Sequence, residues 1–208
     1  MSVRFIVTGT DTGIGKTIFA AALTGYLQAR YWKPVQAGLD DETDSEVVAR
    51  LSGLGSRAII PEAYRLVTPC SPHQAAAIDG VTLDPARLAL PDYSGALVVE
   101  GAGGVLVPMS DDFLMADLFV LLGLPAVLVA RTSLGTINHS LLALEALRAR
   151  GITVAGVAFV GEGNHESERV ICAMGSVRRL GRLPHIEPLD AKTLAKAFAA
   201  GFDPGSWK

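Results

Sequence analysis

The sequence predicts a doubly wound α/β fold, in which a mostly parallel sheet carries helices on both faces. Short apolar runs alternate along the chain with helix-like segments, which is the order of elements in a parallel sheet. The runs are apolar at nearly every position, as strands covered on both faces must be. Since such sheets bind ligands beyond the carboxyl ends of their strands, functional residues are expected just after each strand.

The predicted elements follow one another along the whole chain. Near-continuous apolar runs predict strands at residues 4–8, 31–35, 96–100, 126–130 and 153–159. Amphipathic segments predict helices at residues 16–29, 43–51, 138–150, 166–174 and 192–200. The helix over 138–150 is indicated by leucines at near-helical spacing, namely Leu141, Leu142, Leu144 and Leu147. The apolar run 118–122 is expected in the core.

The composition predicts one folded domain over residues 1–208. Half of the chain is hydrophobic and 19% is charged, so a large core can be buried and disorder is excluded. There are 18 Lys and Arg residues against 21 Asp and Glu residues, a formal net charge of −3. This balance argues against a nucleic-acid partner held by a strongly basic surface.

Cysteine usage and apolar segments bear on location. Cys70 and Cys172 have no metal-ligand spacing, and two reduced thiols are favoured over a disulfide between them, which the sequence leaves open. The longest apolar region, 118–130, contains Gly123 and Pro125 and is shorter than the ~20 residues that cross a bilayer. The start of the chain lacks the pattern of a signal peptide. A cytoplasmic location without a membrane partner is expected.

A glycine-rich segment after the first predicted strand gives the strongest functional signal. Residues 9–17 read Gly-Thr-Asp-Thr-Gly-Ile-Gly-Lys-Thr, with five residues between the first glycine and Gly-Lys-Thr, where the usual phosphate-binding loop (P-loop) has four. Gly13 and Gly15 let backbone N–H groups face a phosphate at a helix N-terminus. Lys16 can reach the β- and γ-phosphates, and the Thr17 hydroxyl can ligate Mg²⁺. A glycine-rich turn without a ligand would not need the Lys-Thr pair.

Two carboxylates are candidates for the opposite side of a Mg²⁺ site. Glu100 ends an apolar strand and precedes Gly-Ala-Gly-Gly at residues 101–104. A buried carboxylate needs a cationic partner, either a metal or a structural arginine, and the small residues that follow favour a metal or nucleotide role. Asp44 lies in Thr-Asp-Ser-Glu at 43–46, which is also a capping box, so Asp44 either complements the helix dipole or binds metal.

Lys33 places a charge inside the apolar run over 31–35. One interpretation is a lysine that points to solvent at a sheet edge, which the following Pro34 supports. The other is a cation aimed into the site, where it stabilises negative charge that develops in a transition state. The residues alone leave both interpretations open.

Five segments in a fixed order carry a family resemblance. They are the loop 9–17, Lys-Pro-Val at 33–35, Ser-Pro-His at 71–73, Val-Glu-Gly-Ala-Gly-Gly at 99–104 and Leu-Gly-Thr-Ile-Asn-His at 134–139. Together they resemble the dethiobiotin synthases, a P-loop NTPase-like family of biotin biosynthesis. The resemblance implies a ligase that closes 7,8-diaminononanoate with CO₂ and ATP, through a carbamate and a carbamic-phosphoric mixed anhydride, to dethiobiotin, ADP and phosphate. It also implies Mg²⁺ as cofactor and a homodimer.

The resemblance also implies a role for each matching residue. Lys33 and Lys16 are expected to be catalytic, and Thr17, Asp44 and Glu100 to hold the metal. The implied nucleotide-binding residues are Gly13, Ile14, Gly15, Lys16, Thr17, Ile18, Asp44, Glu100, Gly101, Ala102, Gly103, Leu183 and Pro184. The implied substrate-binding residues are Thr12, Lys33, Ala37, Gly135, Thr136, Ile137 and Asn138. The last four would come from the partner subunit, where Asn138 opens a helix whose free N–H groups attract the substrate carboxylate.

Two departures from the family pattern affect substrate contacts. Ala37 stands where many relatives have a small hydroxyl residue near the diamine, and Gln36 is a candidate replacement. Val160 and Gly161 stand where relatives often have Asn-Asp facing the base. Because an apolar side chain cannot read an adenine amide edge, relaxed nucleotide selectivity is expected, with Asn164 as a candidate replacement.

The alternative function is a regulatory or partitioning ATPase of the same P-loop class. Such ATPases usually carry a second lysine early in the loop, but residues 10–12 contain none, and the tail 202–208 is short and nearly uncharged. The chemistry requires no imidazole, so His73 and His139 are expected to be structural, and His165 and His185 to lie in loops.

Overall fold

A computed structural model describes residues 3–207, so Met1, Ser2 and Lys208, at the ends of the two terminal segments considered above, lie outside the described residues. The strands are β1 (Arg4–Gly9), β2 (Arg30–Trp32), β3 (Val35–Ala37), β4 (Ile59–Ile60), β5 (Tyr64–Leu66), β6 (Leu97–Glu100), β7 (Ala126–Arg131), β8 (Val154–Val160) and β9 (Arg179–Leu183). The α-helices are α1 (Lys16–Leu27), α2 (Asp44–Leu51), α3 (Pro72–Asp79), α4 (Met115–Leu122), α5 (Thr136–Arg148), α6 (His165–Met174) and α7 (Ala191–Gly201).

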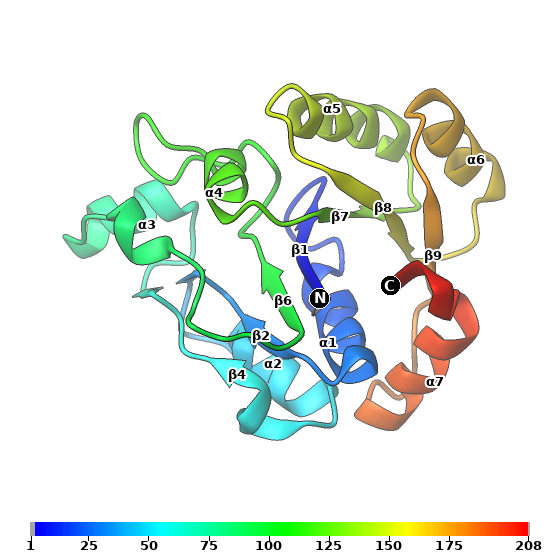
Figure 1. Ribbon diagram of the computed structural model, residues 1–208, viewed down its shortest axis with the longest axis horizontal. Coiled ribbons are helices and arrows are strands. Elements are labelled where there is room, and N and C mark those ends of the chain that lie inside the picture. Colours follow the sequence, from blue (N-terminus) through cyan, green and yellow to red (C-terminus); the bar gives the residue numbers. More distant parts are fainter. Residues whose placement is uncertain (1–2, 208) are drawn as a thin grey trace.

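Seven of these strands form one sheet in the order β4-β2-β6-β1-β7-β8-β9 (Figure 1). Neighbouring strands run parallel, with Val7 of β1 opposite Glu100 of β6 and Val127 of β7. Because β1 and β6 are parallel neighbours, their carboxyl ends lie at the same edge of the sheet, next to the point where the strand order reverses. The predicted parallel α/β sheet is confirmed.

Helices cover both faces of this sheet. On one face, α1, α2 and α7 pack against the sheet through Phe19, Val48 and Phe198. On the other face, α4, α5 and α6 do so through Phe119, Leu144 and Ile171 (Figure 1). Burial of the strands on both faces explains their continuous apolar sequences.

The predicted strand over 31–35 is wrong in one respect, because it is two strands in different sheets. β2 belongs to the main sheet, whereas β3 pairs in parallel with β5 in a separate two-stranded sheet. The break falls at Lys33 and Pro34, and proline has no N–H with which to continue the ladder. Since β2 pairs with both β4 and β6, Lys33 leaves an interior strand, and the edge interpretation is also wrong.

Several helix boundaries differ from the predictions. α1 ends at Leu27 and is followed by Gln28 at φ 51°, and α5 begins at Thr136 rather than at Asn138. The run 118–122 belongs to α4, whose Val120 and Leu121 are half exposed, so only part of this run is core. α3, α4, β4, β5 and β9 were not among the predicted elements. β4 and β5, of two and three residues, are too brief to show a clear period.

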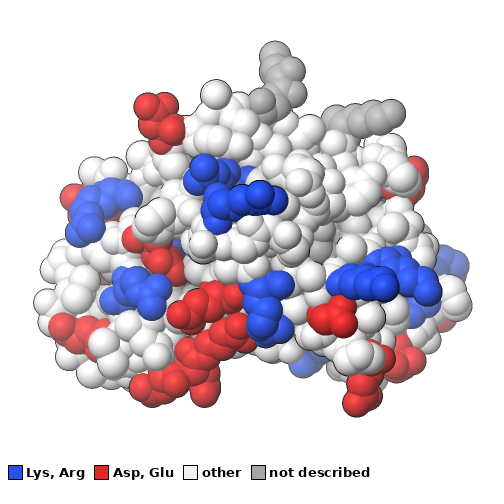
Figure 2. Space-filling model, turned by 90° about the horizontal axis from the view of Figure 1, so that it is seen from below, with Lys and Arg blue, Asp and Glu red and all other residues white. Residues whose placement is uncertain are grey.

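Charged side chains of both signs lie on the face of the molecule that Figure 2 presents. Figure 2 shows separate groups of basic and acidic residues on the face it presents, as the near-balanced composition predicts. Within residues 3–207, the helices are all too short or too polar to cross a bilayer.

Candidate functional site

The loop between β1 and α1 has the conformation that its glycines allow. Gly13 and Gly15 have φ values of 70° and 93°, which disfavour side chains that carry a Cβ. A Cβ on Gly15 would also lie 2.7 Å from a methyl carbon of Val160. Gly15 is the N-cap of α1 and makes no side-chain cap, so the first N–H groups of the helix remain available to a phosphate.

Lys16 and Thr17 begin α1 at the carboxyl edge of the sheet. The buried Lys16 ammonium donates to the carbonyl oxygen of Asp11 in the loop. Burial lowers the pKa of Lys16 to about 8, and the nearby Glu100 carboxylate offsets part of this effect. The Thr17 hydroxyl lies 2.6 Å from Asp44 Oδ1 and 3.0 Å from Glu100 Oε1. The hydroxyl and both predicted carboxylates therefore meet at one point.

Lys33 points into the same site. Its Nζ lies 2.6 Å from Asp44 Oδ2 and 3.3 Å from Glu100 Oε1, and it donates to the Gly101 carbonyl oxygen at 3.1 Å. Lys33 is 3% exposed and Glu100 is 1% exposed. Glu100 thus has the cationic partner that its burial requires, and Lys33 faces the cavity rather than solvent.

The pKa values of these groups follow from burial and charge. Burial alone would lower the pKa of Lys33, but the Glu100 and Asp44 carboxylates outweigh it and hold that pKa above its ordinary value. Burial raises the pKa of Glu100, against the attraction of Lys33. For Asp44, which is less buried, the charge and hydrogen bond of Lys33 outweigh burial and lower the pKa. Lys33 therefore remains an ammonium ion and Asp44 a carboxylate.

α2 places Asp44 by means of its N-terminal cap. Thr43 and Glu46 form the predicted capping box, with the Thr43 N–H donating to Glu46 Oε2 at 2.8 Å. This box fixes the start of the helix and leaves the Asp44 carboxylate for Thr17 and Lys33. Asp44 therefore lies in the first turn of α2 and also lines the cavity, so the two alternatives drawn from the sequence do not exclude each other.

These groups open onto a cavity of about 700 Å³. Most of the predicted site residues line it: Thr12, Gly13, Gly15, Lys16, Thr17, Ile18, Lys33, Ala37, Asp44, Glu100, Ala102 and Gly103. Gly101 does not line the cavity, but its carbonyl oxygen accepts a hydrogen bond from Lys33 Nζ. The cavity is also lined by Gln36, which the sequence made a candidate substrate contact, and by Pro69, Cys70, Ser71, Pro72 and Val107. Sequence reasoning did not place the last five in the site, although Ser71 and Pro72 belong to a motif that it noted.

Gln36 lines the cavity beside Ala37 with its side-chain amide hydrogen-bonded to the backbone. Its Nε2 donates to the carbonyl oxygens of Ala37 and Gly38 at 3.2 and 3.3 Å, and its Oε1 accepts from the Asp44 N–H at 3.3 Å. The Gln36 side-chain amide is therefore hydrogen-bonded to backbone groups at the cavity wall. Gln36 therefore shapes the cavity wall and helps to hold Asp44 in place.

A second cavity, of about 400 Å³, adjoins the loop. It is lined by the predicted residues Gly13, Ile14, Gly15, Ile18, Leu183 and Pro184. Val160 and Gly161, which the sequence placed opposite the base, also line it. Sequence reasoning missed the other lining residues, Arg131, Thr132, Ser133, His185, Ile186 and Leu189. Asn164 does not line this cavity. Its Oδ1 caps α6 by accepting from the Ser167 N–H at 3.1 Å, and its Nδ2 donates to the Thr132 carbonyl oxygen at 3.3 Å. These bonds do not favour Asn164 as a base-reading amide, and its role stays a prediction.

The segment 135–138 forms the start of α5 and faces a separate surface hollow. Gly135 is the N-cap at φ 92°, so Thr136, Ile137 and Asn138 make up the first turn. Asn138 does not open the helix, although its position in the first turn keeps it near the free N–H groups. The Thr136 hydroxyl donates to the Arg131 carbonyl oxygen.

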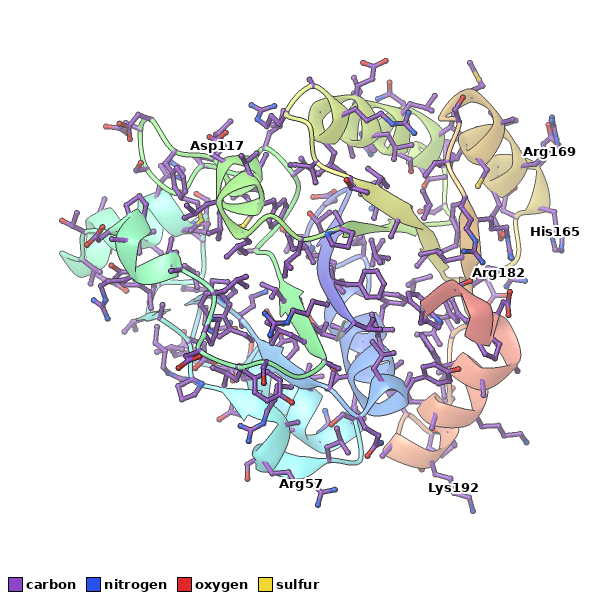
Figure 3. The ribbon with its side chains drawn as sticks, in the orientation of Figure 1. Arg57, Asp117, His165, Arg169, Arg182 and Lys192 are labelled. Carbon is purple, nitrogen blue, oxygen red and sulfur yellow. The ribbon has the colours of Figure 1, made fainter. Side chains whose placement is uncertain are left out.

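His73, His139, His165 and Cys172 do not line the cavity around Lys33, whereas Cys70 does. His73 Nδ1 lies 3.0 Å from Ser71 Oγ, and His165 is the first residue of α6 rather than a loop residue, pointing away from the molecule (Figure 3). Cys70 and Cys172 are free thiols. Within residues 3–207 no group of three or more His, Cys, Asp or Glu side chains is arranged to hold a metal ion.

The donors around Thr17 nevertheless suit Mg²⁺. One hydroxyl and two carboxylates converge, and Mg²⁺ prefers such hard oxygen ligands while keeping several waters of its own. The fold and this site together define a P-loop nucleotide-binding protein: a parallel sheet, a glycine-rich loop after β1, and Lys-Thr at the start of α1.

Comparison with known proteins narrows this class. The family model described as "AAA domain" matches residues 3–193. ATP-dependent dethiobiotin synthetases of Nitrobacter hamburgensis and Novosphingobium aromaticivorans are 61% and 64% identical to this chain, over 97% and 95% of it and 95% and 96% of their own lengths. The chain belongs to the ATP-dependent dethiobiotin synthetase family.

Solved structures of other P-loop proteins share the fold. The cell division ATPase MinD of Pyrococcus furiosus has a TM-score of 0.57 at 15% identity, covering 95% of this chain and 97% of its own. MinD of Pyrococcus horikoshii, in complex with Mg-ADP, has a TM-score of 0.58 at 14% identity, covering 95% and 94%. At such low identity the likeness concerns architecture alone.

Proposed function

We propose that the chain is an ATP-dependent ligase that closes the cyclic urea of dethiobiotin from 7,8-diaminononanoate, CO₂ and ATP in biotin biosynthesis. Full-length identity of about 60% with dethiobiotin synthetases supports this function. The observation that carries it is the convergence of Lys16, Lys33, Thr17, Asp44 and Glu100 at one cavity beside the P-loop. We propose that residues 1–208 act as a single synthase domain.

The two lysines supply the positive charge that phosphoryl transfer between anions requires. In the proposed complex, the loop N–H groups and Lys16 bind the β- and γ-phosphates. This requires Lys16 to exchange the Asp11 carbonyl for a phosphate oxygen. Lys33, which Asp44 and Glu100 hold at the cavity wall, would stabilise the carbamate and the transferring phosphoryl group.

Thr17, Asp44 and Glu100 would hold Mg²⁺. When bound, the ion neutralises charge on the nucleotide phosphates. The chain contributes the oxygen donors, whose arrangement is set by the approach of the Thr17 hydroxyl to Asp44 Oδ1 and Glu100 Oε1.

The proposed reaction has three steps that balance. One amine of the substrate attacks CO₂ and loses a proton to give a carbamate. A carbamate oxygen attacks the γ-phosphorus and ADP leaves, forming the mixed anhydride. The second amine then attacks the carbonyl carbon, phosphate leaves with the bonding pair, and a proton is released. The role of the chain in each step is to hold the reactants in line and exclude water.

The organic substrate would occupy the cavity beside Thr12 and Ala37, next to Lys33. We propose a homodimer in which Gly135, Thr136, Ile137 and Asn138 of one chain receive the substrate carboxylate bound to the other. Leu183 and Pro184 would border the base in the second cavity. The cytoplasmic location stays a prediction.

The test is an assay of the purified chain with ATP and Mg²⁺. Phosphate release should be slow alone and much faster with diaminononanoate and bicarbonate together, with dethiobiotin detected by mass spectrometry. Stimulation by DNA or lipid vesicles, with none by the diamine, would support the partitioning ATPase instead.

A further inference from the structure

Tyr31 stands behind the site rather than in it. It lies in β2, opposite Val98 of β6, and alternate residues of a strand share a face, so Val98 and Glu100 both face the side on which Tyr31 packs. The ring is 0% exposed and belongs to the core that also contains Val98 and Val48. Tyr31 does not line the cavity, so it can reach the reactants only through another residue.

That residue is Glu100. The Tyr31 hydroxyl donates to Glu100 Oε2 at 2.9 Å. The other carboxylate oxygen, Oε1, lies 3.0 Å from the Thr17 hydroxyl and 3.3 Å from Lys33 Nζ. Glu100 Oε2 therefore faces the core and Oε1 faces the groups that line the cavity.

We propose that Tyr31 is a positioning residue, which holds Oε2 of Glu100 so that Oε1 faces the bound metal and the phosphates. This proposal rests on the proposed function. A tyrosine hydroxyl suits this task because it donates a hydrogen bond without adding a charge. An arginine or lysine in its place would neutralise Glu100 and compete with the cations of the cavity. Hydrogen bonds of this kind orient metal-binding carboxylates in other proteins.

The test is the Tyr31→Phe variant, which removes one oxygen atom and keeps the ring. Binding of ADP without metal, and Mg²⁺ titration of the protein–ADP complex, are measured by calorimetry. We expect metal-free ADP affinity within about twofold of wild type, while the Mg²⁺ concentration at half of the metal-dependent signal rises about 10- to 100-fold. The kcat should fall by a similar factor with little change in the KM for ATP.

Tyr64→Phe is the matched control. It also removes a buried tyrosine hydroxyl, one that accepts from the Asp84 N–H at 2.9 Å and lies away from the cavity. A merely structural role for Tyr31 predicts the same behaviour for both variants, namely a lower Tm with an unchanged Mg²⁺ midpoint, and would overturn the proposal. Parallel loss of metal-free ADP binding in Tyr31→Phe would overturn it too.

A double-mutant cycle tests whether Tyr31 acts through Glu100. In a Glu100→Gln background, Tyr31→Phe should leave the Mg²⁺ midpoint unchanged, because the group it positions is already altered. Additive effects of the two substitutions on the Mg²⁺ midpoint would contradict the proposal. So would a Tyr31→Phe protein that folds only when Glu100→Gln is also present. The calorimetric and thermal measurements do not use the diamine, so failure of ring closure by the wild-type chain would refute the proposed function without deciding this test.

Discussion

Lys33 and Asp44 form an ion pair of 2.6 Å that joins the end of β2 to the start of α2. Asp44 accepts at the same time from Thr17 at the start of α1. A single carboxylate therefore links the P-loop helix to the lysine proposed to stabilise the transition state. Lys33 thereby lines the same cavity as Lys16 and Thr17 of the P-loop helix.

Lys33→Ala should lower turnover by about 10²- to 10³-fold, the loss seen when one preorganised electrostatic group is removed. From the sequence alone, this variant is expected to keep its fold nearly unchanged. The buried pair with Glu100 alters that expectation, because removal of one partner leaves a buried charge and costs about 3–5 kcal/mol of stability. Steady-state kinetics and thermal unfolding measure the two effects.

The Lys33→Ala/Glu100→Gln variant separates these effects. It removes the uncompensated charge, so its Tm should recover toward wild type while turnover stays low. Near-full activity in Lys33→Ala would contradict the catalytic role of Lys33.

Lys16 should make nucleotide binding depend on pH above about 8. Burial lowers its pKa to about 8, and a polyphosphate binds the ammonium form. ADP affinity should therefore fall toward tenfold per pH unit above that value, with proton uptake on binding. Calorimetry at pH 9 in buffers of different ionisation heats measures the uptake. Lys16→Arg keeps its charge at pH 9 and is the control; proton uptake that persists in it would assign the effect to another group.

The same pKa has the opposite consequence for folding. The unfolded lysine titrates near 10.5, so between about pH 8 and 10.5 the unfolded state binds more protons than the folded state. Stability of the nucleotide-free protein therefore gains a contribution from Lys16 as pH rises through this range. Denaturant unfolding of wild type and Lys16→Arg, compared at pH 7.5 and 9.5, measures this contribution.

The apolar pattern was sufficient to predict the architecture because parallel strands must be buried on both faces. The apolar pattern was insufficient at 31–35. Apolar residues flank Lys33 and Pro34 on both sides, so the segment resembles one strand, although the hydrogen-bonded ladder ends at Trp32. The P-loop was predictable because glycines, lysine and threonine at fixed spacing carry the chemistry locally. The start of α5 was misplaced because Gly135, its cap, has no side chain that signals a helix.

The relations between distant residues were not predictable from one sequence. Whether Lys33 faces solvent or Glu100 depends on the position of β2 between β4 and β6, which is a property of the whole sheet. Tyr31 shows the same limitation, because its hydrogen bond to Glu100 joins strands far apart in the chain. In the sequence it is one more apolar residue of a strand.

The second cavity predicts weak discrimination between nucleobases. Val160 packs against Gly15, the Gly161 N–H already donates to the Leu183 carbonyl oxygen at 2.9 Å, and Asn164 caps α6. The kcat/KM values for ATP, CTP and GTP should lie within about 100-fold, whereas a site that hydrogen-bonds the base discriminates by about 10⁴ or more. Asn164→Ala should leave these ratios unchanged while destabilising the helix cap by about 1 kcal/mol. Strict use of ATP would refute this prediction.

Leu134 should hold the proposed dimer together. It is 99% exposed and directly precedes the segment assigned to the partner's substrate. Burial of such a side chain contributes about 1.5–3 kcal/mol, and a two-fold interface counts it twice. Leu134→Asp should therefore weaken the dimer about 10²- to 10⁴-fold, as sedimentation equilibrium would measure.

Activity and nucleotide binding should respond differently to this change. Leu134→Asp should abolish ring closure at low protein concentration but keep ADP binding, because the P-loop, Lys33, Asp44 and Glu100 all belong to one chain. Leu121→Asp, on α4 at 55% exposure, is the control and should remain dimeric and active. A Leu134→Asp protein that is monomeric yet fully active would show that each chain completes its own substrate site, and the carboxylate would then have to bind within the cavity around Lys33.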